Sequence, residues 1–278
     1  MPASGPRPWV LITGCSTGIG RALVPLCREA GWGVVATARR LETLTDLPPG
    51  EDLRVLALDV TDPRSIAEAV AACADLPLRA LVNNAGYGQT GPLELARPED
   101  LRAQFETNVV GLHAVTTAFL PLLRRQPAPR IIQVASMLGR LSIPLAGPYN
   151  ASKHAVVALA ETLRLEIGKD VAVVLVEPGA IRTAFQENLA RAWGDLRERA
   201  RGTRYEAVLA RHLAARTRGR AMGIPAEACA RRIVRALVAD HPPRRVVIGR
   251  DAFWAGKAKA LLPAAWWERL LRRVFGLR

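Results

Sequence analysis

The chain has 278 residues, 50% of them hydrophobic, which is enough for one large core or two modest ones. Its four cysteines are scattered, without a C-x-x-C pair or a nearby histidine cluster, so free thiols in a reducing compartment are favoured over disulfides or a zinc site. No run approaches the ~20 apolar residues that span a bilayer, and the N-terminus lacks the pattern of a signal peptide. We therefore expect a cytoplasmic globular protein that holds no metal.

The formal net charge of +14 is concentrated in the last third of the chain. Residues 1–181 carry 17 Arg and Lys against 17 Asp and Glu, whereas residues 182–278 carry 22 against 8. This confinement favours a surface that faces an anionic partner, such as a membrane, a nucleic acid or an acidic substrate. Solvated Arg-rich helices are the alternative interpretation.

Apolar runs rich in β-branched residues alternate with helical stretches along most of the chain. Helices are predicted at about 19–30, 63–74, 98–125 and 149–167. Strands are predicted in seven runs: WVLIT, GVVATA, LRVLALDV, ALVNNAG, RIIQVAS, VAVVLVEPG and RVVIG. Strands that are apolar throughout and separated by helices imply a parallel sheet covered on both faces. The fold class is therefore α/β, with a single Rossmann-type, doubly wound, seven-stranded parallel sheet in residues 1–250.

Residues 183–224 interrupt this alternation between the sixth and seventh strands. They are Arg-rich and mostly helical in propensity. An insertion at the carboxyl edge of a parallel sheet lies beside the crevice where ligands bind. We expect a helical substrate lid in this segment.

A glycine-rich turn follows the first predicted strand. The stretch LITGCSTGIGRAL places Gly14, Gly18 and Gly20 where the backbone can turn tightly and approach a pyrophosphate at a helix N-terminus. Their spacing is G-x-x-x-G-x-G rather than G-x-G-x-x-G, and a purely structural turn is the alternative. The strand before the turn and the helix after it favour a dinucleotide site.

Basic residues follow the second predicted strand, where the adenine ribose of a dinucleotide would lie. Arg39 and Arg40 stand where a site for NAD would usually offer an acidic residue to the ribose 2′-hydroxyl. An Arg suits a 2′-phosphate, and Ser16 and Thr17 in the turn could donate hydrogen bonds to the same group. The alternative is that an Arg merely starts a basic helix. The pattern predicts NADP(H) in preference to NAD(H).

Tyr149 and Lys153 lie four positions apart at the start of a predicted helix. A free tyrosine titrates near ~10, so proton exchange at neutral pH requires a stabilised phenolate. Side chains at i and i+4 are neighbours, and a nearby cation stabilises the phenolate. Only four of the 39 basic residues are Lys, and a compact ammonium can hold a ribose hydroxyl and the phenol together where a forked Arg would not. The pair predicts proton transfer by Tyr149.

Over nearly its whole length the chain resembles the short-chain dehydrogenase/reductase family. Seven motifs carry the resemblance in order: TGCSTGIG from Thr13, LDV with Asp59, NNAG at 83–86, ETNVVG with Asn108, VAS ending at Ser136, the Tyr149–Lys153 pair, and PG at 178–179. The resemblance implies hydride transfer between a nicotinamide cofactor and a carbonyl or alcohol.

Four residues receive catalytic roles from this resemblance. Tyr149 would be the general acid/base, and Ser136 would orient and polarise the substrate carbonyl. Lys153 would lower the tyrosine pKa and bind the nicotinamide ribose, and Asn108 would hold a water that links Lys153 to solvent. Cofactor contacts are implied for Gly14, Ser16, Thr17, Gly18, Ile19, Gly20, Arg39, Asp59, Val60, Asn83, Ala85, Gly86, Tyr149, Lys153, Pro178, Gly179, Ile181 and Thr183.

Four further residues are interpreted as structural. His154 follows Lys153 but does not share its helix face. Cys15 is a small side chain that packs in the turn, and Asn83 and Asn84 tie strands together and line the adenosine crevice.

The stretches TGCSTGIG, VVATARRLETL and YNASKHAVVALAETLRLEI resemble the branch of hydroxysteroid and retinol dehydrogenases, which acts on lipophilic alcohols and ketones. We expect an NADP(H)-dependent oxidoreductase for a steroid-, retinoid- or fatty-like small molecule. The alternatives are a 3-oxoacyl-thioester reductase and a non-catalytic NADP-binding sensor or scaffold. The resemblance also implies a homodimer or homotetramer built through the helices near 98–125 and 149–168. No basic patch with interleaved aromatics suggests nucleic acid.

The C-terminal extension, 251–278, is basic and amphipathic. Trp267, Leu270, Leu271, Val274 and Phe275 follow helical spacing and form one apolar stripe opposite Arg residues. Such a helix either docks on the protein or a second subunit, or lies peripherally at a membrane interface.

Overall fold

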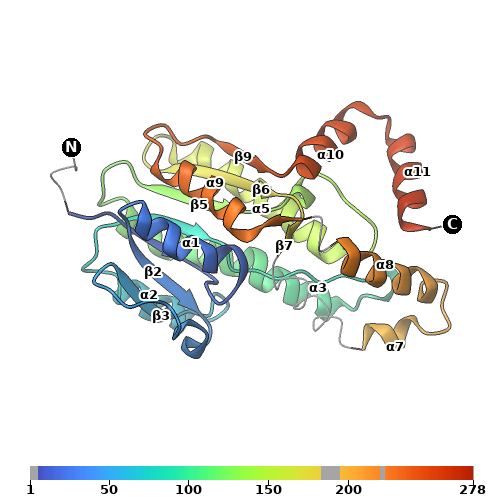
Figure 1. Ribbon diagram of the computed structural model, residues 1–278, viewed down its shortest axis with the longest axis horizontal. Coiled ribbons are helices and arrows are strands. Elements are labelled where there is room, and N and C mark those ends of the chain that lie inside the picture. Colours follow the sequence, from blue (N-terminus) through green and yellow to red (C-terminus); the bar gives the residue numbers. More distant parts are fainter. Residues whose placement is uncertain (1–5, 183–194, 220–222, 278) are drawn as a thin grey trace.

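The computed structural model describes residues 6–182, 195–219 and 223–277, which are coloured in Figure 1. Seven strands form one parallel sheet in the order β3-β2-β1-β4-β5-β6-β9, which confirms the predicted fold class. They are β1 (Trp9–Ile12), β2 (Gly33–Ala38), β3 (Leu53–Ala57), β4 (Leu78–Asn83), β5 (Arg130–Val134), β6 (Ala172–Pro178) and β9 (Arg245–Ile248). The strand order reverses at β1, so a ligand crevice is expected at the carboxyl ends of β1 and β4.

Both faces of the sheet are buried beneath helices. Successive strand residues point to opposite faces, so in β1 Val10 and Ile12 join one core cluster and Leu11 joins the other. The first cluster lies under α1 (Gly18–Glu29) and α9 (Ala226–Val238), and the second under α2 (Pro63–Ala71), α4 (Leu112–Leu123) and α5 (Gly147–Ile167). Burial on both sides explains why strands such as β1 and β2, whose residues are all buried, read as largely apolar runs.

The stretch 98–125, predicted as one helix, is divided into three parts. α3 (Pro98–Phe105) passes into a π-helical segment, Glu106–Gly111, which continues as α4. A π turn spaces its hydrogen bonds at i→i+5 and accommodates an extra residue, which apolar periodicity does not reveal. Asn108 lies in this segment.

The insertion begins and ends at a second, two-stranded sheet. β7 (Ile181–Arg182) pairs in parallel with β8 (Ile224–Pro225), so the residues that flank this insertion lie side by side. The described part of the insertion contains two helices, α7 (Leu196–Ala200) and α8 (Glu206–Gly219).

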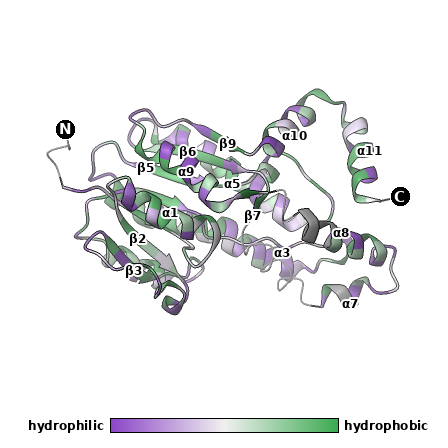
Figure 2. Cartoon of the chain, in the orientation of Figure 1, coloured by the Kyte–Doolittle hydropathy of each residue, from purple (hydrophilic) through white to green (hydrophobic). Residues whose placement is uncertain are grey.

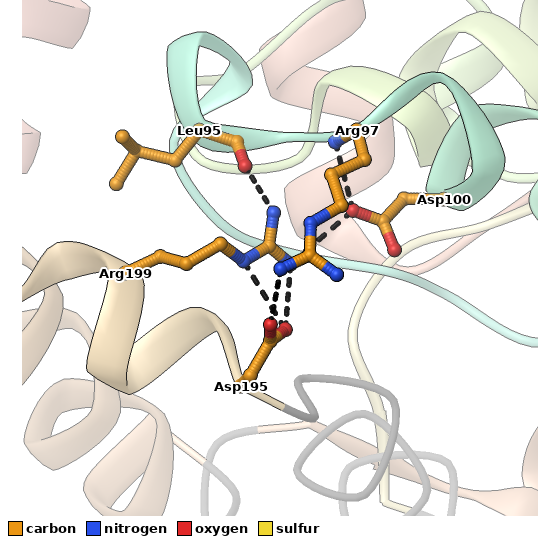
Figure 3. A network of polar contacts seen from close by, with 5 residues as sticks. All are labelled: Leu95, Arg97, Asp100, Asp195 and Arg199. Carbon is orange, nitrogen blue, oxygen red and sulfur yellow. Dashed lines mark hydrogen bonds and ion pairs between the residues drawn. The ribbon is translucent and has the colours of Figure 1, made fainter.

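A polar network holds α7 against the start of α3 (Figure 3). Arg199 donates to the main-chain carbonyl oxygen of Leu95 and pairs with the carboxylates of Asp100 and Asp195. Arg97, at the N-cap of α3, reaches Asp195 as well. Because several of these groups are partly exposed, each pair contributes little free energy, and the network chiefly fixes where the insertion sits.

Two helices complete the C-terminal extension, α10 (Arg250–Leu261) and α11 (Ala264–Phe275), at the same end of the molecule as α7 and α8 (Figure 1). The predicted apolar stripe is split between two environments. Trp267 is buried and Phe275 is half-buried, whereas Leu270 and Val274 are exposed. Within the described residues, no helix has the length and hydropathy needed to cross a bilayer.

Candidate active site

A cavity of about 740 Å³ lies at the carboxyl ends of the sheet strands. The segments that follow β1, β2, β3, β4, β5 and β6 line it, together with residues of α5 and one residue of α8. Segments far apart in the sequence therefore meet in one place, as parallel topology requires of loops at the same sheet edge.

The glycine-rich turn forms one end of this cavity. Gly14 and Gly18 both have positive φ, +73° and +62°, which glycine adopts without steric cost. A Cβ on Gly14 would lie 2.9 Å from the Cα of Ala85, and one on Gly20 would lie 2.2 Å from the Gly14 carbonyl oxygen. Side chains at Gly14 and Gly20 would therefore push apart the turn, the start of α1 and the segment after β4.

Arg39 and Asp59 line the cavity beside the turn. Arg39 is exposed and directly follows β2, whereas Arg40 lies outside the lining. Asp59 Oδ1 accepts hydrogen bonds from the main-chain N–H and the hydroxyl of Thr61, at 2.9 and 2.8 Å. The carboxylate is thus held in place, and the Arg39 guanidinium contributes a positive charge to this part of the site.

Ser136, Tyr149 and Lys153 all line this cavity. Ser136 follows β5, and its Oγ accepts a hydrogen bond from the Leu138 main-chain N–H at 3.1 Å. Lys153 lies one turn after Tyr149 on α5, with its Nζ 5.8 Å from the centre of the Tyr149 ring. A Cβ on Gly139 would lie 2.7 Å from the Lys153 carbonyl oxygen, so this glycine lets the loop after Ser136 pack directly on α5.

Lys153 is buried, with 6% of its surface exposed. Its Nζ donates a hydrogen bond to the Val134 carbonyl oxygen at 2.9 Å. Burial away from water disfavours the ammonium and lowers the pKa of Lys153 to about 8. The group therefore changes charge within the range in which a tyrosine would need to be activated.

Asn108 is fully buried behind this cluster rather than in the cavity lining. Its Nδ2 donates to the Tyr87 carbonyl oxygen and to Ser152 Oγ, and its Oδ1 accepts from the Tyr87 main-chain N–H. The amide thereby ties the π-helical segment to α5 and to the segment after β4. A Cβ on Gly86 would lie 3.0 Å from Asn108 Oδ1 and 3.9 Å from Lys153 Nζ, so these groups converge on one glycine.

Of the predicted site residues that the structure describes, sixteen line the cavity and three do not. The sixteen are Gly14, Ser16, Thr17, Gly18, Ile19, Arg39, Asp59, Val60, Ala85, Gly86, Ser136, Tyr149, Lys153, Pro178, Gly179 and Ile181. Gly20 and Asn108 support the lining from behind, and Asn83 is buried in β4 with its Nδ2 bonded to Thr116. Thr183 lies outside the described residues. Asn84 lines the cavity where Asn83 does not.

Several residues that line the cavity belong to none of the predicted motifs. They include Thr90, Met137, Leu138, Ile143, Ala146 and His212. These positions belong to no short motif, and His212 comes from the insertion, so no local sequence signal marks them. Their composition, which is mostly apolar, became apparent only from the fold.

Two structural residues behave as interpreted from the sequence. Cys15 is buried outside the lining, and burial raises its pKa to about 12. His154 also lies outside the lining, with Nδ1 2.8 Å from the Asn150 carbonyl oxygen. In the described part of the chain, no group of three or more His, Cys, Asp or Glu side chains is placed to hold a metal ion.

The doubly wound sheet with a glycine-rich first turn defines a Rossmann-type fold. The profile of the short chain dehydrogenase family matches residues 8–193. Oxidoreductase BOA17 of Botryotinia fuckeliana is 32% identical over 263 residues, covering 91% of this chain and 93% of that protein. The chain therefore belongs to the short-chain dehydrogenase/reductase family and is an oxidoreductase of that family.

Other similar proteins carry different names, and two of the solved structures contain different nicotinamide cofactors. The 17-beta-hydroxysteroid dehydrogenase type 1 of Mus musculus is 39% identical over 204 residues, 69% of this chain and 59% of that protein. A short chain dehydrogenase from Burkholderia cenocepacia, solved with NADP, has a TM-score of 0.74 at 27% identity, covering 95% of this chain and 97% of that one. One from Burkholderia phymatum, solved with NAD, has a TM-score of 0.75 at 28% identity, covering 90% and 91%.

Proposed function

We propose that the protein interconverts a carbonyl and an alcohol by hydride transfer with a nicotinamide dinucleotide, NADP(H) in preference to NAD(H). The observation that carries this proposal is the cluster of Ser136, Tyr149 and buried Lys153 in the same cavity as the glycine-rich turn. A donor, a proton-exchanging phenol and a cation thus lie within reach of one bound molecule.

The cofactor would rest on the turn between β1 and α1 and extend toward Tyr149. Glycines allow the close approach of a pyrophosphate, and the N-terminus of α1 offers unpaired N–H groups and the positive end of its dipole. Pro178, Gly179 and Ile181 also line the cavity and suit the nicotinamide end. When bound, the nicotinamide supplies or accepts the hydride.

Tyr149 and the side chains around it would carry out the proton transfer. During reduction the Tyr149 hydroxyl gives its proton to the carbonyl oxygen, and the Ser136 hydroxyl donates a hydrogen bond to the same oxygen. The Lys153 ammonium favours the resulting phenolate. Because the Asn108 Nδ2 donates to Tyr87 and Ser152, a water that links Lys153 to solvent would donate to a carbonyl oxygen of Asn108, in the main chain or the side chain.

The NADP preference rests on charge beside the turn. Arg39 follows β2 and lines the cavity, and a guanidinium matches a 2′-phosphate in geometry and charge. Ser16 and Thr17 also line this part and offer hydroxyl donors.

The substrate we propose is lipophilic. Met137, Leu138, Ile143 and Ala146 give the wall beyond Ser136 an apolar surface. A hydroxysteroid dehydrogenase and a 3-ketodihydrosphingosine reductase are among the similar proteins by name. We propose that residues 183–224 form the lid over this side of the cavity, as part of a catalytic domain that spans 1–250.

The test is NADPH consumption with estrone, all-trans-retinal, 3-ketodihydrosphingosine and an acetoacetyl thioester. We expect turnover of a lipophilic carbonyl, a lower rate with NADH, and a loss of about 10³-fold or more in Tyr149→Phe, which keeps the ring and removes the proton. Preference for the thioester would contradict the lipophilic assignment. Tight NADPH binding without turnover of any carbonyl would favour a sensor or scaffold and contradict the enzymatic proposal.

We also propose that the C-terminal extension touches an anionic membrane surface. Trp254, Leu261, Trp266 and Val274 are 62%, 80%, 65% and 69% exposed, beside exposed Arg residues on α11. Green and purple turns mark this mixture on α10 and α11 in Figure 2. Aromatic side chains next to cationic ones suit the interface of an anionic bilayer.

Sedimentation with vesicles tests this contact. We expect the protein to pellet with phosphatidylserine-containing vesicles and to stay in solution with phosphatidylcholine alone. Trp266→Ser combined with Val274→Ser should reduce pelleting several-fold because it removes exposed apolar surface. Equal pelleting of this variant, or none by either protein, would contradict the proposal.

A homodimer or homotetramer formed through α4 and α5 is the assembly we propose. Leu165 on α5 is 84% exposed, and Val110 in the π-helical segment is 49% exposed. Light scattering after size-exclusion chromatography should give a mass of two or four chains, with Leu165→Arg shifting it toward one. A monomeric wild type would contradict this assembly.

A further inference from the structure

The start of α10 contacts the segment that follows β6. The Asp251 carboxylate accepts a hydrogen bond from the Ala180 main-chain N–H at 2.6 Å. Space for this carboxylate depends on two glycines, because a Cβ on Gly179 or Gly249 would lie 2.2 or 2.3 Å from Asp251 Oδ1. Gly249 also has a φ of +108°, which turns the chain from β9 into α10. The glycines and the carboxylate therefore form one unit at the cavity wall.

The end of α11 contacts α8 of the insertion. The Phe275 ring stacks on the His212 ring, with centroids 5.7 Å apart and planes 28° apart. Arg211 Nη2 also donates to the Gly276 carbonyl oxygen at 3.1 Å. His212 itself lines the cavity. The end of α11 is therefore connected to the cavity through the His212 side chain.

We propose that the C-terminal extension is a strap across the active site, with Asp251 and Phe275 as positioning residues at its two ends. Asp251 holds the Pro178–Ala180 segment beside the nicotinamide, and Phe275 holds His212 against the substrate. This inference rests on the proposed function for its kinetic consequences. It gives the extension a role in the reaction that is separate from any contact with a membrane.

The chemistry at the two ends predicts different effects. A carboxylate that accepts a main-chain N–H fixes the backbone of the nicotinamide wall, and this hydrogen bond is charge-assisted. A stacked aromatic pair fixes ring orientation and contributes to packing. Loss of the first contact should weaken cofactor binding, and loss of the second should weaken substrate binding alone.

The Asp251 end is tested by NADPH titration of the full chain, followed by energy transfer from tryptophan. Asp251→Ala removes the acceptor and should weaken NADPH binding about tenfold. Asp251→Asn keeps an acceptor oxygen and should stay within about threefold of the wild type. NADPH binding by Asp251→Ala equal to that of the wild type would overturn this end of the proposal.

The Phe275 end is tested by hydrogen–deuterium exchange of residues 206–219 and by KM. Phe275→Ala should speed exchange in α8 and raise KM for the preferred carbonyl about three- to tenfold, with NADPH affinity unchanged. Phe275→Trp retains an aromatic ring and should restore most of both. Unchanged exchange in Phe275→Ala would overturn this end.

The two proposals fail in distinguishable ways. A wild type that binds neither NADPH nor NADH would contradict the proposed function before any variant is compared. A wild type that binds NADPH while Asp251→Ala binds it equally well would contradict the strap alone. Exchange in α8 needs neither cofactor nor substrate, so it decides the Phe275 end in either case.

Discussion

Lys153 is a charged side chain at a position whose burial would suit an apolar one. Its Nζ has one hydrogen bond, to the Val134 carbonyl oxygen, and burial lowers its pKa from 10.5 to about 8. Below pH 8 the folded and unfolded chains both carry the proton, so folding bears the full cost of burying the charge. Between pH 8 and 10.5 the Lys153 amine is protonated only in the unfolded chain. The free energy of unfolding therefore rises with pH over this range.

We therefore expect Lys153→Met to stabilise the protein at pH 7 and to inactivate it. The shift corresponds to about 3 kcal/mol, and the lost hydrogen bond offsets about 1, leaving a gain of about 2 kcal/mol in the free energy of unfolding. The gain should shrink as pH rises from 8 to 10.5. Urea unfolding at several pH values measures it, and a variant less stable than the wild type at pH 7 would contradict the argument.

Arg39 gives a residue-scale test of cofactor choice. Arg39→Ala should raise KM for NADPH about 10- to 100-fold, because a charge-assisted contact to the 2′-phosphate is lost, and leave KM for NADH within about threefold. Arg40→Ala is the matched control, since Arg40 is equally exposed but outside the cavity lining. Steady-state kinetics with both cofactors decides. Parallel changes for NADPH and NADH in Arg39→Ala would count against a phosphate contact.

At the scale of elements, the catalytic geometry depends on how closely the loop after β5 approaches α5. Gly139→Ala would place a methyl group 2.7 Å from the Lys153 carbonyl oxygen and from Val157. We expect kcat to fall about 10- to 100-fold, because a shift on the order of 1 Å separates Ser136 from Tyr149, with NADPH binding largely kept.

Gly168→Ala, at the C-terminal end of α5, separates this effect from lost stability. Gly168 follows α5 with a φ of +58° and has open space around its Cβ position. The variant should lose about 1–2 kcal/mol of stability through backbone strain and keep its kcat. If Gly139→Ala also kept its kcat, close packing of the loop on α5 would not matter for the reaction.

The sequence predicted the elements that burial defines and missed those that local geometry defines. Seven strands were predictable because residues such as Leu11 and Val10 are buried on opposite faces of one sheet. The π turn at Asn108 was not, since one added residue shifts the apolar pattern by a single position and α4 is too uniformly apolar for that shift to show. β7 and β8 are too short, at two residues each, to give any period.

The candidate site divides in the same way. The predicted cofactor contacts lie in short contiguous motifs, because turns at the end of each strand need particular residue types, and fifteen of these residues line the cavity. The substrate wall is assembled from tertiary contacts. His212 comes to the cavity through the packing of the insertion, and no pattern around it in the sequence indicates that position.

At the scale of the whole molecule, the four cysteines are distributed over the cores on both faces of the sheet. Cys15, Cys27 and Cys229 lie in the core cluster under α1 and α9, and Cys73 lies in the opposite one. Burial raises the pKa of each, to about 12 for the first three and about 11 for Cys73. The thiolate is the reactive form of cysteine. In the native state burial keeps reagents away from these side chains and keeps them as thiols.

We expect no cysteine to react with an aromatic disulfide reagent at pH 8 until the protein unfolds. All four should then react together in denaturant, because opening either layer of the sheet disrupts the single domain. Absorbance of the released thiolate, recorded against urea concentration beside circular dichroism, gives the measurement. Rapid labelling of one cysteine in native buffer would reveal a local opening that the packing does not suggest.

The parallel pairing of β7 with β8 has a consequence for how such proteins diversify. Ile181 is paired with Ile224 and Arg182 with Pro225, so the chain leaves the central body and returns to it at one point. Lengthening a loop whose ends are already joined costs only about 0.6 kcal/mol per doubling. We therefore expect the stretch between β7 and β8 to tolerate replacement by a segment of different length or sequence. Because we propose that this stretch covers the substrate, we expect that grafting the equivalent stretch of a relative between residues 183 and 223 transfers that relative's substrate preference and leaves the cofactor preference unchanged.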